Sequence, residues 1–362
     1  MLLPYITVCK DLFGIFSGEM ASQGTRFVGG HTQIVLSVAV SNLPNVRIIS
    51  GAESGELAVW TVDGTNVHKS WIGEGDVTSL ACSTSRPDIF YAACGDTISC
   101  FDLRQLTGPV SQLDSVDEEI NQIALNEKEN FLASADDSGN IKVFNLSSSK
   151  LYKTLRKHTN ICAAVSFRPN RPWELVSGAY DSSLIQWDFA KSRSFCIIRL
   201  EELGAVPENL ESYVVSPSFV HSIAVSSTGN RLACGTENAL VQIFDSSKKT
   251  LHFQKTLRHH TQGVSQVHFP KFDEDKYLVS GGNDGRICVW NLEEELSHGV
   301  ALTNGCSVAA GNNSVHQTAH NPAIEINHTE KINWLASGAV NNNKFLAVAD
   351  NTSCPVIFQF PL

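Results

Sequence analysis

Three histidines toward the C-terminal end of the chain, His316, His320 and His328, are the residues that most resemble a metal site. Imidazole nitrogens are common zinc ligands, and a structural or catalytic site needs three or four ligands on fixed elements. These three lie in or beside an irregular Asn-, Ser- and Ala-rich stretch, with no carboxylate at ligand spacing on a regular element. We interpret them as residues of a solvated loop, and the sequence predicts no metal site.

Two acidic groups could in principle serve as general acids or bases. Asp136 and Asp137 stand between two strand-like runs, where Asp is favoured because its side chain hydrogen-bonds the backbone of a turn. The acidic run 114–119 lies between two such units and is interpreted as a solvated connector, with a ligand site as the alternative. The zinc-protease, phosphate-loop, nucleophile-elbow and dinucleotide motifs are absent from the sequence. We therefore predict a protein that is not an enzyme, with no catalytic residue and no cofactor.

Composition narrows the class of partner. The formal net charge of the 362 residues is −10, which argues against a broad basic surface for nucleic acid or anionic lipid. The ten cysteines include no C-x-x-C pair, so zinc clusters and secreted disulfide scaffolds are not predicted. No apolar run is long enough to span a membrane, and the apolar start lacks the basic residues of a signal peptide. We expect a reduced intracellular protein of the cytoplasm, the nucleus or both.

An internal repeat dominates the chain. Each copy is a strand of small apolar residues, a Gly/Asp/Asn turn, and an alternating strand that ends in an aromatic residue, which is the pattern of a β-hairpin. The closing aromatics are Trp60, Phe101, Phe144, Trp187, Phe244, Trp290 and Phe358. Four of the six intervals between them measure 41–46 residues, which is the length of one blade in a β-propeller built from four-stranded sheets. The sequence predicts an all-β, seven-bladed ring.

The remaining segments are placed around this ring. The two longer intervals predict loop insertions near 191–218 and 293–327, and residues 1–20 are expected to be a weakly ordered or disordered extension. The ring itself then comprises residues 21–362. Because the last unit lacks an outer strand, we expect Arg26-Phe27-Val28 to supply it, so that pairing of the two ends closes the ring.

The repeats resemble those of the WD-repeat (WD40) β-propeller family. In that family a His, a Ser or Thr, an Asp and a Trp form a buried hydrogen-bonded set inside a blade, with the Asp four residues and the Trp ten residues after the Ser. This chain completes the spacing twice, with His158, Ser177, Asp181 and Trp187, and with His260, Ser280, Asp284 and Trp290. Elsewhere Ser54, Ser138 or Asn238 takes the position of the Asp. These sets are expected to satisfy buried polar groups, and so to maintain the architecture.

One repeat ends differently from the others. Residues 89–104 resemble the W-D-x-R box by which some WD-repeat propellers, the substrate receptors of cullin-4 ubiquitin ligases, contact the adaptor damage-specific DNA-binding protein 1. The resemblance makes five residues candidates for adaptor binding: Asp96, Phe101, Asp102, Leu103 and Arg104. Phe101 departs from the usual Trp, and Tyr91 stands where a small residue is common. Segments such as Leu132–Ile141, His158–Pro169 and Val348–Cys354 also resemble a narrower WD-repeat family that is counted among candidate receptors of this kind.

Function is therefore expected to reside in protein surfaces. The leading hypothesis is a non-enzymatic scaffold that serves as a cullin-4 substrate receptor. The first alternative is a propeller that grips a peptide, such as a histone tail, at its wide face or channel, where a ring of acidic residues would favour a basic ligand. The second is an architectural subunit of a stable complex, which a large apolar surface patch would favour.

Overall fold

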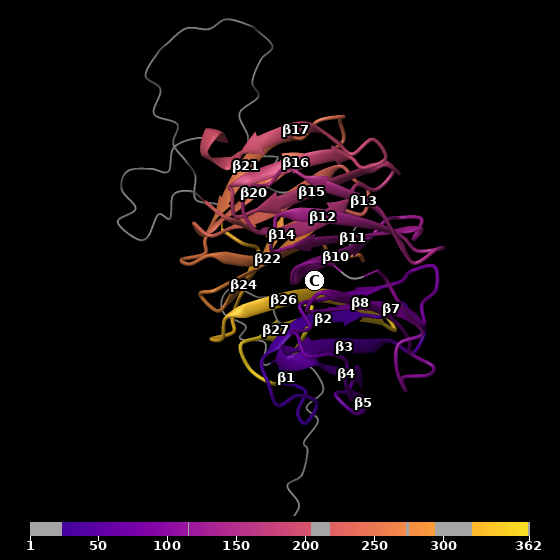
Figure 1. The fold of residues 1–362 in the computed structure, drawn as a ribbon. Coiled ribbons are helices and arrows are strands. Elements are labelled where there is room, and N and C mark those ends of the chain that lie inside the picture. The colour runs from indigo at the N-terminus through magenta and orange to yellow at the C-terminus, as the bar shows by residue number, and fades with distance from the viewer. Residues whose placement is uncertain (1–23, 115, 204–217, 273–274, 294–320, 361–362) are drawn as a thin grey trace, which may run out of the picture.

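Each predicted repeat forms a four-stranded antiparallel sheet, and seven such sheets are arranged as blades around an axis (Figure 1). The computed structural model describes residues 24–114, 116–203, 218–272, 275–293 and 321–360. Within each blade the chain runs from the innermost strand to the outermost, except that the outer strand of blade 7 comes from the N-terminal end. The predicted seven-bladed propeller closed by its terminal strands is thus confirmed.

Blades 1–4 contain the following strands: β2 Val35–Val40, β3 Arg47–Ala52, β4 Glu56–Thr61, β5 Asn66–Trp71; β6 Ser79–Cys82, β7 Ile89–Cys94, β8 Thr97–Asp102, β9 Ser111–Gln112; β10 Ile120–Leu125, β11 Phe131–Asp136, β12 Asn140–Asn145, β13 Lys150–Arg156; and β14 Cys162–Phe167, β15 Glu174–Ala179, β16 Ser183–Asp188, β17 Arg193–Arg199. Blades 5–7 contain β18 Val220–Val225, β19 Arg231–Thr236, β20 Leu240–Asp245, β21 His252–Arg258; β22 Val264–His268, β23 Tyr277–Gly282, β24 Arg286–Asn291, β25 Ile324–Asn327; and β26 Ile332–Val340, β27 Asn343–Asp350, β28 Val356–Gln359, β1 Thr25–Arg26. Two short 3₁₀ helices complete the list, η1 Glu53–Gly55 and η2 Leu200–Leu203.

The hairpins between second and third strands are short because their turns use residues that tolerate unusual backbone angles. In blade 6 the turn between β23 and β24 ends at Gly285, whose φ is 71°. A Cβ atom at this position would lie 2.8 Å from the backbone of Thr329, so both the angle and the space require glycine. We call the side of the ring that carries these turns, where the innermost strands begin, the top face; the innermost strands end at the bottom face.

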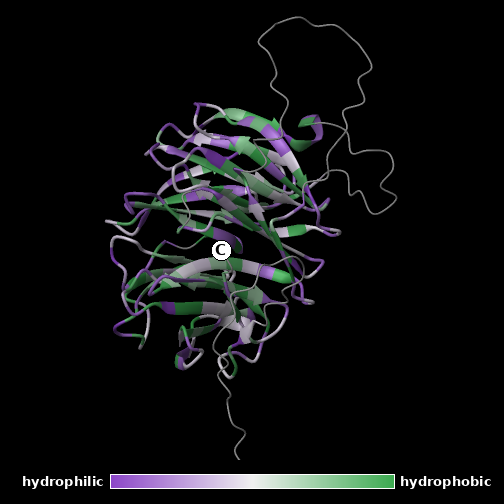
Figure 2. Cartoon of the chain, turned by 180° about the vertical axis from the view of Figure 1, so that it is seen from behind, coloured by the Kyte–Doolittle hydropathy of each residue, from purple (hydrophilic) through white to green (hydrophobic). Residues whose placement is uncertain are grey.

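The core is divided among the junctions between blades. Seven clusters of buried apolar side chains each join two neighbouring blades, so that the sheets are covered on both sides. In Figure 2, much of the strand ribbon is accordingly coloured as hydrophobic. This explains why the second and third strands read as nearly continuous runs of small or apolar residues, since neither side of such a strand faces water. Trp60, Trp187 and Trp290, three of the repeat-closing aromatics, are almost fully buried.

The ring is closed by the segment just before blade 1. Thr25 and Arg26 pair with Ile357 and Val356 of β28, and the backbone N–H of Phe27 donates to the carbonyl of Pro355. The Phe27 side chain, 1% exposed, then packs against Trp60 of blade 1 with ring centroids 5.5 Å apart. The segment therefore holds blade 7 by hydrogen bonds and blade 1 by apolar contact.

Two outer strands lie inside the ranges that the sequence suggested as insertions. β17 falls within 191–218 and β25 within 293–327, and each completes its blade by pairing with the third strand. The continuous apolar run from Phe195 to Ile198 in β17 is the signal of this strand. The predicted extension 1–20 lies outside the described residues, as do 204–217 and 294–320.

The two predicted polar sets come together inside blades 4 and 6. In blade 4, His158 Nε2 lies 2.7 Å from the Ser177 hydroxyl, to which the Trp187 indole N–H donates across 2.8 Å. His158 Nδ1 lies 3.0 Å from the Asp181 carboxylate. His260, Ser280, Asp284 and Trp290 repeat this arrangement in blade 6, with distances of 2.8–3.1 Å. Every polar atom of the set that is buried between sheets thus has a partner.

Other blades satisfy the same polar groups from other positions. In blade 1, His31 and Trp60 both hydrogen-bond the Ser50 hydroxyl. Glu56 supplies the carboxylate in place of an aspartate, and it accepts a hydrogen bond from the Thr32 backbone N–H. Glu56 stands 3.5 Å from His31 Nδ1, which is an ion-pair separation without hydrogen-bond geometry. Burial lowers the pKa of His31 to about 4, so this imidazole is neutral at pH 7.

In blade 7, the residues at the corresponding positions help to close the ring. His328 Nε2 lies 2.6 Å from the carboxylate of Asp350, which also accepts from Arg26 across 3.1 Å. His328 is only 9% exposed, so its interpretation as a solvated loop residue is wrong; it opens an innermost strand, as His158 and His260 do. His316 and His320 lie outside the described residues. Although burial opposes ionisation, hydrogen bonds from His328 and Thr352 and the charge of Arg26 hold the pKa of Asp350 below its usual value.

Replacing Phe27 with alanine is expected to destabilise the whole ring, because it empties a filled site between the first and last blades. The free energy of unfolding should fall by about 3–5 kcal/mol, the usual cost of a large-to-small change at a buried aromatic. The neighbouring Val28→Ala is the matched control, since Val28 is 71% exposed and should change stability by about 0.5 kcal/mol or less. Urea unfolding followed by tryptophan fluorescence measures both, and equal midpoints for the two variants would contradict closure by this segment.

The Asp181 carboxylate should make stability depend on pH in the acid range. Burial raises its pKa, but hydrogen bonds from His158 and Ser183 outweigh that effect and lower the pKa to about 2. Because the pKa is depressed by folding, the contribution is present above the unfolded value near 4 and is lost as pH falls toward 2. The stability difference between wild type and Asp181→Asn should therefore shrink by about 2 kcal/mol between pH 5 and pH 2. The control Glu118→Gln alters an exposed carboxylate and should change the stability at pH 5 by about 0.5 kcal/mol or less.

Candidate interaction sites

Arg104 lies on the bottom face, two residues after β8 ends. Its Nε and one terminal nitrogen donate to the two carboxylate oxygens of Asp102, at 2.9 and 2.6 Å, and its backbone N–H donates to the same carboxylate. Asp88, at the start of the second strand, stands 3.8 Å from Nε. The hydrogen bonds from Arg104 lower the pKa of Asp102 to about 2. The guanidinium is held in one orientation although its side chain is 70% exposed.

The remaining predicted box residues are distributed differently. Phe101 is 2% exposed and stacks on Phe90 with centroids 5.1 Å apart, so it packs the blade where other repeats have tryptophan. Leu103 packs against the core between blades 1 and 2. Asp96 occupies the turn before β8, on the top face, and a six-residue strand of about 20 Å separates it from Asp102. The structure thus brings together Asp102, Leu103 and Arg104, but not Asp96.

Asp88 is a member of the Arg104 site that sequence reasoning missed. It lies fourteen residues before Asp102, at the start of the paired strand, where the carbonyl of Asp88 accepts the backbone N–H of Leu103. The hairpin register Ile89–Asp102 was the signal that could have found it, because paired strands bring the residues at their ends together.

The acidic run 114–119 fastens blade 2 to blade 3. Asp114 accepts from the Lys150 amine and the Leu151 backbone, and Asp117 accepts from Lys142 at 2.7 Å. Val116 between them is 3% exposed. The run is a connector, as expected, but Asp114 and Asp117 are engaged by lysines of the next blade. Asp136 likewise behaves as a turn residue, because it accepts from the Ser138 hydroxyl and the Asn140 backbone.

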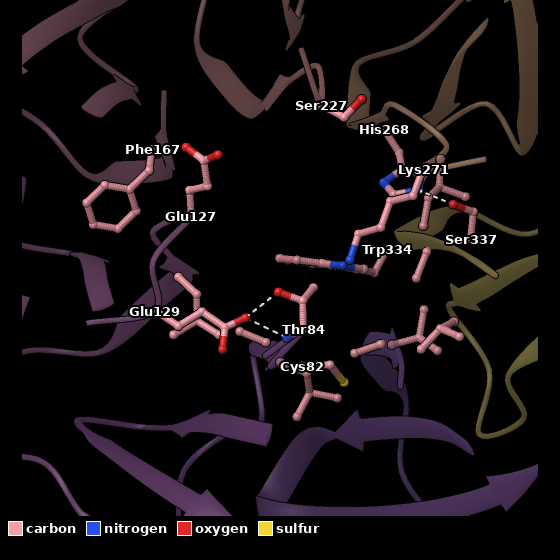
Figure 3. Close-up of a pocket in the computed structure, with 18 of the residues that line it drawn as sticks. Cys82, Thr84, Glu127, Glu129, Phe167, Ser227, His268, Lys271, Trp334 and Ser337 are labelled. Carbon is pink, nitrogen blue, oxygen red and sulfur yellow. Dashed lines mark hydrogen bonds between the residues drawn. The ribbon is translucent and has the colours of Figure 1, made fainter. Parts of the chain in front are cut away.

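A cavity of about 460 Å³ opens at the bottom end of the axial channel (Figure 3). Apolar side chains such as Leu80, Phe167 and Trp334 form much of its wall. Glu129 on this wall is occupied by the hydroxyl and backbone groups of residues 83–85. His268 lies 2.8 Å from the hydroxyl of Ser337, but burial lowers the pKa of His268 to about 4. It is therefore a poor base at neutral pH, which argues against activation of Ser337 as a nucleophile.

The top end of the channel is acidic. Asp76 and Glu119 precede the innermost strands of blades 2 and 3, and Asp137 follows the second strand of blade 3. Partial burial, together with repulsion from Asp76 and Asp137, raises the pKa of Glu119. Glu237 follows the second strand of blade 5 on the same face and pairs with His221. A carboxylate with a raised pKa favours binding of a cation beside it, since the cation relieves the repulsion.

The described residues contain neither a metal-binding cluster nor a membrane-spanning helix. In the described ranges, no three or more His, Cys, Asp or Glu side chains are grouped so that they could hold a metal ion. In the same ranges, no helix is long and apolar enough to cross a membrane. Burial raises the pKa of the Cys82 thiol to about 12, so the thiol stays protonated.

The repeats match a known family model. The model described as "WD domain, G-beta repeat" matches residues 149–188 and 251–291. Each match starts at the outer strand of one blade and ends with the third strand of the next, and the two matched blades are those with the complete sets of His158 and His260. The matched repeats are therefore those with the full hydrogen-bonded set.

Related proteins extend the similarity over the whole ring. WD repeat-containing protein 53 homolog of Dictyostelium discoideum is 28% identical over 89% of this chain and 90% of its own length. Protein SUPPRESSOR OF PHYA-105 1 of Arabidopsis thaliana is 28% identical over 49% of this chain, and ribosome biogenesis protein bop1-A of Xenopus laevis is 24% identical over 72%. The chain spans only 16% and 38% of these two longer proteins. The narrower resemblance noted in the sequence is thus to WD repeat-containing protein 53, and the chain carries WD40 repeats within a seven-bladed β-propeller.

Proposed function

We propose that this propeller is a substrate receptor that docks on damage-specific DNA-binding protein 1, the adaptor of cullin-4 ubiquitin ligases, inside the cell. The observation that carries the proposal is the Arg104 site: an exposed arginine, oriented by Asp102 and Asp88, at the exit of a third strand. The likeness to WD repeat-containing protein 53 supports it, because that family is counted among candidate receptors.

The geometry of Arg104 suits recognition of a partner. Two of its five side-chain N–H groups are used by Asp102, which leaves three for carbonyl or carboxylate oxygens of another protein. Because Asp102 fixes the guanidinium beforehand, little side-chain entropy is lost on docking. The pair is exposed and so contributes little to folding, which separates its role in binding from stability.

Arg104→Glu is expected to abolish adaptor binding without unfolding the ring. It places a third negative charge beside Asp102 and Asp88 and removes the donors that a partner would use. We expect at least a tenfold loss of affinity for purified adaptor in isothermal titration calorimetry, with a melting temperature close to that of wild type.

The matched control is Arg199→Glu, because Arg199 is 65% exposed and also pairs with a carboxylate, but on blade 4. Its adaptor affinity should equal that of wild type. Absence of adaptor binding by wild type, or equal loss in both variants, would rule out this docking site.

A second candidate function is supported by the acidic top end of the channel. The raised pKa of Glu119 between Asp76 and Asp137 favours a lysine- or arginine-rich peptide there, such as a histone tail. The two functions use opposite faces, so a receptor could hold such a peptide as its recruited ligand.

Glu119→Gln should weaken binding of a fluorescein-labelled histone H3 tail peptide several-fold, because it removes one of the converging charges. Fluorescence polarisation at low and high salt measures this, and affinity should fall with salt. Glu118→Gln, at the exposed neighbouring position, is the control and should bind as wild type does. Equal affinities for wild type and Glu119→Gln would eliminate this site.

A further inference from the structure

An aromatic cluster lies on the bottom face where blades 3 and 4 meet. Phe131 begins β11, Tyr152 lies in β13, Trp173 precedes β15 and Phe189 follows β16. The centroid of Phe131 is 5.1 Å from that of Tyr152, 5.7 Å from that of Trp173 and 5.3 Å from that of Phe189. We call these four residues the aromatic platform. Aromatic pairs at such separations attract one another, so the cluster is a fixed surface.

The platform has a buried floor and an exposed rim. Phe131 and Phe189 are 5% and 0% exposed, whereas Tyr152 and Trp173 are 38% and 46% exposed. The floor is already explained by the core between blades 3 and 4. The core does not account for the rim, because the rings of Tyr152 and Trp173 remain exposed to water on a surface that the packing of the blades leaves uncovered. Exposed Trp and Tyr on a rigid support are typical of protein-binding surfaces.

The polar atoms of the rim point to an acceptor-rich partner. Within the described contacts, neither the Trp173 indole N–H nor the Tyr152 hydroxyl has a hydrogen-bond partner. An indole N–H can only donate, and a phenol donates readily to a carboxylate. The rim thus offers donors beside apolar rings.

A positive charge adjoins the rim of the platform. The Lys153 amine stands 5.5 Å from the centre of the Tyr152 ring, and among the described residues no carboxylate lies within ion-pair distance of this amine. Carboxylates of the neighbouring turns have other partners: Asp114 pairs with Lys150, Asp188 with Lys191 and Glu174 with Arg168, while Glu127 and Glu129 accept from backbone or hydroxyl groups. The Lys153 amine therefore remains available to a carboxylate of a ligand.

We propose that the aromatic platform docks an acidic segment of a partner protein, with an apolar or aromatic side chain of that segment resting between Tyr152 and Trp173. Its carboxylates face Lys153 and accept from the indole and phenol. The site uses blades 3 and 4 and none of the residues around Arg104, so it goes beyond adaptor docking and stands independently of it.

The test uses a short fluorescein-labelled peptide with a central phenylalanine flanked by glutamates, titrated with the full chain in fluorescence polarisation. Wild type should bind it saturably, and Trp173→Ala and Lys153→Glu should each weaken binding about tenfold. Lys153→Glu leaves the ring packing in place, so it tests the site even if Trp173→Ala lowers stability. A peptide with lysines in place of the glutamates should bind at least tenfold more weakly.

The matched control is Trp71→Ala, because Trp71 is 62% exposed on the outer strand of blade 1, away from the platform. It should bind the acidic peptide as wild type does. Lack of saturable binding by wild type would overturn the proposal. So would equal loss in Trp71→Ala and Trp173→Ala, or a preference for the lysine peptide.

Discussion

The structure depends on one constraint: a blade is stable only when both of its faces are covered. Each sheet shares an apolar cluster with the blade before it and another with the blade after it, so a ring opened between blades 7 and 1 would expose both halves of the cluster at that junction. Closure therefore has to involve residues far apart in sequence. The hydrogen bond from Arg26 to Asp350 spans 324 residues, and Phe27 carries the closure on into blade 1. Loop-closure entropy opposes such a contact, but it grows only slowly with loop length, and the gain from covering two sheet faces exceeds it.

Inside several blades the buried polar groups are hydrogen-bonded by residues that vary from blade to blade, although His31 Nδ1 and the Ser134 hydroxyl have no hydrogen-bond partner. Asp181 and Asp284 stand four residues after the serine, whereas Glu56 reaches the Thr32 backbone from a position two residues further along. Asp350 meets His328 from two residues before the usual place and adds Arg26 as a partner. Blade 2 uses neither, since Ala92 and Phe101 occupy the positions of the serine and the tryptophan, and Phe101 stacks on Phe90. Removing all members of a buried polar set is nearly neutral, while removing one leaves an unsatisfied group.

Much of the fold could be predicted from the sequence because it repeats. The closing aromatics gave the number of blades, and the His–Ser–Asp–Trp spacing identified the two complete sets. Details that depend on contacts between different repeats could not be predicted in this way. The sequence did not show that Asp88 would join Arg104, that Asp96 would stand on the opposite face, or that His328 would be buried against Asp350. The aromatic platform could not be predicted from the sequence either. Its four residues come from separate segments of the chain and meet only when blades 3 and 4 pack.

A rigid ring allows these surfaces to act independently. Blades joined on both faces by close-packed clusters transmit no hinge motion, so a partner at one site meets a site that is already formed. The two faces also differ in chemistry: carboxylates converge at the top end of the channel, whereas Arg104 and the aromatic platform present donors on the bottom face. Arg104 belongs to blade 2, and the platform to blades 3 and 4, with no hydrogen-bond partner in common among the described contacts. Binding energies at separate sites of this kind add, because neither site changes the other. A propeller that links one protein to another requires this property, since a partner bound at one surface must not weaken the binding of a second partner at another surface.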